Sequence, residues 1–215
     1  MSDRRLYQAG IAAGLVNLAL LLVFSSGVEL HGVMRHLLFA LYLLSFVVFL
    51  SVLTTIMRSA TSIQSWMPVA AFGGGLASVT INLVRHAIGV VAAPFPPSLP
   101  ADVAGLAPNL HDTLHNLDSA LFFVSLFPLS ILLLGAGIVA LRHDVLPRWF
   151  GWISLISGVL MVPGAVLALT SDNGIVFTLY ELWLLLANVS LLLEVRNMSR
   201  RANSSPVAHP QQIGT

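Results

Sequence analysis

The chain contains no cysteine and no lysine, and charged residues of either sign are scarce. The lack of cysteine excludes a disulfide framework, a zinc–thiolate site, an iron–sulfur cluster and a cysteine nucleophile. Only 9% of the 215 residues are charged and 57% are hydrophobic, whereas about a quarter of the residues of a soluble domain are charged. A domain of this size cannot bury so much apolar surface in a core of its own. The composition therefore excludes a soluble globular fold, a disordered chain and a nucleic-acid-binding protein.

What the sequence does contain is a series of long apolar runs, each close to the roughly 20 residues that a helix needs to cross a bilayer. No strand-like alternation of period two appears, and lipid does not tolerate an open sheet. We therefore predict an all-α protein with a six-span transmembrane bundle over residues 1–196 and a disordered cytoplasmic tail over residues 197–215. The predicted spans cover residues 6–24, 37–57, 68–91, 117–141, 149–169 and 175–195.

The arginines indicate how the bundle lies in the membrane, because short cytoplasmic segments carry an excess of basic residues. With the N-terminus in the cytoplasm, eight of the ten arginines fall in inner segments, Arg35 lies outside and Arg85 lies within the third span. The inner arginines are Arg4, Arg5, Arg58, Arg142, Arg148, Arg196, Arg200 and Arg201. We predict a multi-pass protein of the bacterial inner (plasma) membrane, embedded in the lipid bilayer with both termini cytoplasmic.

Small residues and prolines interrupt several spans. Gly10 and Gly14 form a G-x-x-x-G pair in the first span, a spacing that permits close contact between helices. This pair serves either packing within the bundle or a homodimer. The glycines at 73–75 and the Pro163-Gly164 pair mark either broken helices of the kind that transporters use or crowded helix crossings.

The connection between the fourth and fifth spans reads L-P-R-W-F-G-W at residues 146–152. It resembles the L-P-R-W-x-G-W turn of a family of bacterial six-helix integral membrane proteins of unknown function. Those proteins also share a His-Asp pair ahead of the preceding helix, similar to His111-Asp112 here. The resemblance implies a six-span inner-membrane protein and no particular activity. The residues themselves suit a turn at a membrane surface, because Pro147 interrupts the helix while Trp149 and Trp152 favour the headgroup region.

Arg85 is the most informative polar residue within a predicted span. An arginine at the centre of a membrane helix costs about 2.5–3.5 kcal/mol on insertion scales, so it should face the bundle and have a partner. Asn82, Arg85 and His86 share one helical face. Glu181 in the sixth span lies at a similar depth and is the predicted partner. These four residues form the predicted ligand or ion-pair pocket, and the alternative is an Arg85 side chain that reaches the outer interface.

A second candidate site consists of histidines on the outer side. His111 and His115 are spaced i, i+4, which places two imidazoles on one helical face, and Asp118 continues that face. Two histidines with a carboxylate suit zinc or another divalent metal. The H-E-x-x-H motif of metalloproteases is absent, so ordinary solvated or capping residues are the alternative. No cofactor is firmly implied.

Two amides, Asn17 and Asn188, lie near the middle of predicted spans. They either form hydrogen bonds between helices or line a polar path that runs inward from Arg85.

We expect a bacterial integral membrane protein without catalysis, either a small-molecule binder or a partner subunit, with an outward-facing polar pocket. The alternatives are a transporter-like protein that uses Arg85 and Glu181, and a metal-dependent membrane enzyme or sensor that uses the outer histidines.

Overall fold

A computed structural model describes residues 3–26, 32–61, 65–91, 107–168 and 175–204. The helices are α1 (Asp3–Ser25), α2 (Gly32–Ala60), α3 (Met67–Val91), α5 (Ala107–His143), α6 (Arg148–Ala168) and α7 (Ile175–Ser204). All six are long and apolar enough to cross a membrane, and the described part of the chain contains no strand. The predicted all-α fold with six membrane-spanning helices is confirmed at this level.

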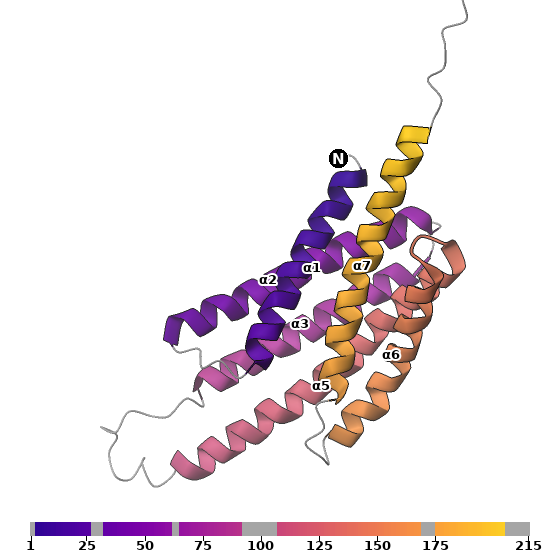
Figure 1. The fold of residues 1–215 in the computed structure, drawn as a ribbon. Coiled ribbons are helices and arrows are strands. Elements are labelled where there is room, and N and C mark those ends of the chain that lie inside the picture. The colour runs from indigo at the N-terminus through magenta and orange to yellow at the C-terminus, as the bar shows by residue number, and fades with distance from the viewer. Residues whose placement is uncertain (1–2, 27–31, 62–64, 92–106, 169–174, 205–215) are drawn as a thin grey trace, which may run out of the picture.

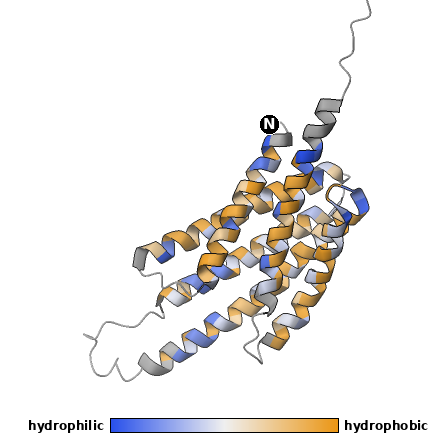
Figure 2. Cartoon of the chain, viewed as in Figure 1, coloured by the Kyte–Doolittle hydropathy of each residue, from blue (hydrophilic) through white to orange (hydrophobic). Residues whose placement is uncertain are grey.

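The helices form a closed ring in chain order (Figure 1). Each helix packs against the next, α7 returns to pack against α1, and α2 also reaches α5 across the ring. The first residues of α1 and the last residues of α7 lie at the same end of the bundle, which we call the terminal end. The opposite end is called the distal end. Hydrophobic residues cover the helices along most of their length (Figure 2).

Aromatic side chains fill the interior of the ring. Trp183 of α7 is fully buried, as are Phe49 of α2 and Phe150 of α6. The centroid of the Trp183 ring lies 6.4 Å from that of Phe49 and 6.1 Å from that of Phe150. The Trp183 indole Nε1–H donates a 2.9 Å hydrogen bond to the Ser154 hydroxyl of α6. The Trp183 indole of α7 thus packs against α2 and α6, and its N–H group has a hydrogen-bond partner.

Glycines allow α3, α5 and α6 to approach backbone to backbone. A Cβ atom on Gly74 would lie 2.5 Å from the carbonyl oxygen of Pro128 in α5, and one on Gly137 would lie 2.9 Å from the carbonyl oxygen of Gly151 in α6. α3 is continuous through residues 73–75, and α6 is continuous through Pro163. The broken-helix alternative is therefore wrong for these positions. Gly74 and Gly75 lie at crowded contacts, whereas nothing lies within 4 Å of a Cβ atom built on Gly73.

The α5–α6 turn lies at the terminal end of the bundle. α5 ends at His143, and Asp144 then adopts a left-handed conformation with φ of 49°. Arg148 Nε donates a 2.9 Å hydrogen bond to Asp144 Oδ1, and this bond and the positive charge of Arg148 lower the pKa of the Asp144 carboxyl. The carbonyl of Pro147 accepts a 2.9 Å bond from the Phe150 amide. This geometry suits the expected role of the turn in ending one helix and starting the next.

Of the helices that extend beyond their predicted bounds, α5 and α7 do so by the most residues. α5 begins at Ala107, ahead of the span predicted from residue 117, because residues 107–116 continue the helix. α7 runs to Ser204, so the prediction of disorder is wrong for residues 197–204. These residues include good helix formers such as Arg200 and Ala202, and no proline occurs before Pro206. The rest of the predicted tail, 205–215, lies outside the described residues.

Candidate functional site

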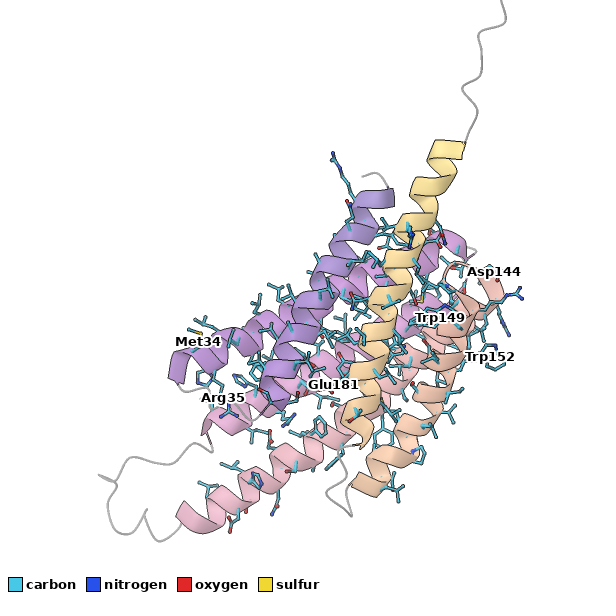
Figure 3. The ribbon with its side chains drawn as sticks, viewed as in Figure 1. Met34, Arg35, Asp144, Trp149, Trp152 and Glu181 are labelled. Atoms are coloured by element: carbon cyan, nitrogen blue, oxygen red, sulfur yellow. The ribbon has the colours of Figure 1, made fainter. Side chains whose placement is uncertain are left out.

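Polar side chains from four helices gather toward the distal end of the bundle. Figure 3 shows Arg35 of α2 and Glu181 of α7 in this half, whereas Asp144, Trp149 and Trp152 lie at the terminal end. We call His36, Arg85, His86 and Asp118 the distal cluster. They come from the start of α2, the end of α3 and the first half of α5, which the up-and-down course of the chain brings to the same end.

Arg85 forms a two-pronged ion pair with Asp118 of α5. Arg85 Nε lies 2.9 Å from Asp118 Oδ1 and Nη2 lies 3.3 Å from Oδ2. The two side chains are 32% and 24% exposed, so the pair is half-buried. The guanidinium carbon also lies 4.8 Å from the ring centroid of Phe122, one turn further along α5, a geometry that adds a cation–π contact.

The predicted pairing of Arg85 with Glu181 is therefore wrong. The two residues do lie toward the same end of the bundle, but α3 packs against α2 and α5, and α7 packs against α1 and α6. Arg85 and Glu181 are thus carried by helices that are not neighbours in the ring. Asp118, which the sequence placed in a metal site, lies on the neighbouring helix α5 and forms the ion pair with Arg85 instead.

His86 pairs with a histidine that was not among the predicted site residues. His36 Nδ1 lies 3.1 Å from His86 Nε2, a hydrogen-bonding distance whose donor depends on the ring tautomers. The His86 ring also stacks on Phe39, with centroids 4.0 Å apart and an angle of 12° between the planes. The sequence feature that could have indicated this contact is the position of His36 near the start of the second predicted span, at the same end as His86. Asn82 instead donates to the Ser78 carbonyl of its own helix, over 2.9 Å.

Glu181 is not part of this ion pair and lies within electrostatic range of Tyr42. Its Oε1 is buried and has no hydrogen-bond partner. Tyr42 of α2 lies within electrostatic range of both Glu181 and Arg85 and shares a side-chain hydrogen bond with Tyr180. The Tyr180 ring packs edge-on against Phe46, with centroids 6.1 Å apart. Glu181 is therefore a carboxyl group near Tyr42, with one buried oxygen that is able to accept a hydrogen bond.

The two amides predicted near mid-membrane are buried between α1, α2 and α7. Asn17 Nδ2 donates to the Tyr42 carbonyl over 2.7 Å and to the Ser45 hydroxyl over 3.3 Å. Asn188 Nδ2 donates to the Leu184 carbonyl of its own helix over 2.8 Å. The Oδ1 atom of each amide is buried without a hydrogen-bond partner. The predicted hydrogen bond between helices is thus confirmed for Asn17. The Oδ1 atoms of both amides remain without a hydrogen-bond donor.

The predicted metal residues are only partly described. His115 is exposed on α5, and the side chain of His111 lies outside the described residues. Both carboxylate oxygens of Asp118 face Arg85. Among the side chains that the structure describes, no group of three or more His, Asp or Glu residues could hold a metal ion. The divalent metal site stays a prediction.

Gly10 and Gly14 face neighbouring helices of their own chain. A Cβ atom on Gly14 would collide with the side-chain amide of Asn188, and one on Gly10 would lie 2.7 Å from Val52 Cγ1 and 3.4 Å from Leu191 Cδ1. The pair therefore serves packing within the bundle. A homodimer through these two glycines would have to share that face, and it stays a prediction.

A shallow apolar depression of about 240 Å³ lies on α6, away from the distal cluster. It is lined by Trp152, Leu155, Ile156, Val159 and Leu160. Trp152 and Val159 are each 60% exposed, as expected for a helix face turned toward lipid. The depression offers no polar group to a ligand.

Comparison with protein-family models, with curated proteins and with solved structures found no match to this chain. The resemblance of the α5–α6 turn to a family of six-helix membrane proteins stays a prediction. Function is therefore inferred from the geometry of the distal half.

Proposed function

We propose that the protein is a non-catalytic integral membrane protein that binds a small organic cation in the distal half of the bundle, with Glu181 as the binding carboxylate. The observation that carries this proposal is the buried Oε1 of Glu181, which has no hydrogen-bond partner. The arginine that was expected to neutralise Glu181 is held by both oxygens of Asp118. Glu181 therefore keeps a buried oxygen that a ligand can satisfy.

Physical chemistry favours a cation at this position. A charged side chain within a bilayer costs a few kcal/mol (about 2.5–3.5 on insertion scales), and ionisable residues there often serve function. A cationic ligand offsets that cost by neutralising the carboxylate. Tyr42 lies within electrostatic range of Glu181, and the faces of aromatic rings attract organic cations. An anion would meet a like charge at this site.

The direction of access follows from the proposed topology. The arginine distribution puts both termini in the cytoplasm, and their location at one end of the bundle agrees with an even number of spans. The distal end then faces the outside of the plasma membrane, and the ligand reaches Glu181 from that side.

The proposal is tested with two hydrophobic ions of the same shape and opposite charge, tetraphenylphosphonium and tetraphenylborate. We expect the cation to raise the thermal stability of the detergent-purified protein, by about 2.7 kcal/mol at a hundredfold excess over Kd, and the anion to have no such effect. Glu181→Gln should abolish the shift. Glu194→Gln is the matched control, because Glu194 lies near the other end of the same helix.

Equal shifts with both ions, or a shift that persists in Glu181→Gln, would overturn the proposal. A transporter is the second candidate function, favoured by the buried amides Asn17 and Asn188, which continue the polar groups from Glu181 toward the terminal end. A metal-dependent enzyme or sensor stays a prediction without a described geometry.

A further inference from the structure

Buried acceptors without donors occur along the interface of α1, α2 and α7. Asn17 is fully buried and Asn188 is 3% exposed, and the Oδ1 atom of each has no hydrogen-bond partner. Glu181 Oε1 is a third such atom. An unsatisfied buried acceptor is unfavourable, and internal water is the usual partner of one. The three atoms are therefore acceptors that internal water could satisfy.

Helix geometry places these groups in order along the bundle axis. Glu181 and Asn188 share one face of α7 and lie about two turns, or about 10 Å, apart. Asn17 lies between their levels, because it bonds to the Tyr42 carbonyl while Gly14, one turn earlier on α1, lies against Asn188. The polar groups thus follow one another at intervals of about one helical turn.

Apolar side chains close this strip on the terminal side of Asn188. Gly10, one turn before Gly14 on α1, lies against Val52 of α2 and Leu191 of α7. Both side chains are buried. Three helices therefore change from polar to apolar contacts at the same level of the bundle.

We propose that α1, α2 and α7 enclose a hydrated path that conducts water and protons between Glu181 and Asn188, closed toward the terminal end by Val52 and Leu191. The path goes beyond the proposed ligand binding, because a cation bound at Glu181 needs no route toward the terminal end. It forms the distal half of a transport route, and movement of α1 away from Val52 would open the other half.

The lack of native cysteine makes hydration of the path directly measurable with single cysteines. Ser45→Cys lies on the path, where Ser45 contacts Asn17. Ser125→Cys of α5 is the matched control, because both serines are buried and each hydroxyl donates to the carbonyl three residues earlier. Ser125 lies about 10 Å along its helix from the distal cluster and Ser45 about 14 Å, so the control is the shallower site.

Right-side-out vesicles are exposed to Ag⁺, a thiol reagent close to water in size, and the remaining thiols are then labelled with maleimide after denaturation. We expect Ser45→Cys to be blocked at least about tenfold faster than Ser125→Cys, because a close-packed interior excludes the ion. Equal rates for the two cysteines would overturn the hydrated path. This result is independent of whether tetraphenylphosphonium binds, so the two proposals fail separately.

Proton conduction is tested in proteoliposomes that contain a pH-sensitive dye. Val52→Ala removes part of the apolar closure and should raise the proton flux several-fold above that of the wild type. Val48→Ala is the control, because Val48 lies one turn away on the same helix and is 41% exposed. An unchanged flux in Val52→Ala, or an equal rise in both variants, would contradict the assignment of Val52 as the closure.

Discussion

The two sides of the ring are held together in different ways. Between α3, α5 and α6, glycines bring backbones into contact, and buried serines such as Ser125 and Ser130 bond to their own helices. Between α1, α2 and α7, side chains meet, and two amides keep unpartnered acceptors. Backbone contacts leave no room for movement or water, whereas side-chain contacts can rearrange. The first side is suited to a fixed support and the second to a site that changes.

The largest effect is expected from adding a methyl group on each side of the ring. On Gly137 the new Cβ would meet the backbone of α6, which cannot move without separating two helices. We expect Gly137→Ala to lower the free energy of unfolding by about 2–3 kcal/mol, within the range for overpacking. On Gly14 it would meet the amide of Asn188, which can rotate, so Gly14→Ala should cost about 1 kcal/mol or less. Denaturant unfolding in detergent measures both.

Equal losses in these two variants would contradict the distinction between the two sides. A loss confined to Gly14→Ala would reverse it.

A smaller effect is expected from breaking the ion pair of the distal cluster. Asp118→Asn leaves Arg85 without its counter-charge, and because the pair is half-buried the cost should be about 1–2 kcal/mol, between the values for buried and exposed pairs. The double variant Asp118→Asn with Arg85→Gln should recover part of this loss. Thermal unfolding of the single and double variants measures the coupling.

Glu181→Gln serves as the comparison, since it removes a carboxylate that has a buried, unpartnered oxygen. We expect its stability to equal or exceed that of the wild type. A loss as large as that of Asp118→Asn would restore the pairing of Arg85 with Glu181 that the sequence suggested.

The smallest effect is expected at the α5–α6 turn, on the closely packed side. Asn tolerates the left-handed conformation of Asp144 better than Ala does, so Asp144→Asn should change stability less than Asp144→Ala. The pKa of Asp144 is lowered in the folded protein, so its ion pair with Arg148 stabilises the fold above the ordinary carboxyl pKa. That contribution is lost as the pH falls through the lowered value.

Unfolding midpoints of the wild type and Asp144→Asn, measured from neutral to acid pH, should therefore converge at low pH. A difference that stays constant with pH would show that the ion pair contributes nothing.

The sequence predicted the helices well and their neighbours poorly, for a physical reason. Helices that contact lipid must be apolar along their length, so the six spans could be found from composition. The shared face of Asn82, Arg85 and His86 followed from helical periodicity, and His86 does lie at a polar contact. Periodicity gives the depth of Arg85 but not which helix packs beside it, so Glu181 was chosen over Asp118. The unpartnered oxygen of Glu181 depends on the same packing and could not be predicted.

The contact between α1 and α7 can form only late in synthesis, after the contact between α1 and α2. Asn17 leaves the ribosome early and can bond to Tyr42 once α2 has been inserted. The contact between Gly14 and Asn188 forms later, because Asn188 lies on α7, the last of these helices to be synthesised. The α1–α2 hairpin therefore enters the bilayer with one side exposed to lipid, and a chain that stops before α7 keeps it exposed. The ring of helices can therefore close only after α7 has been synthesised.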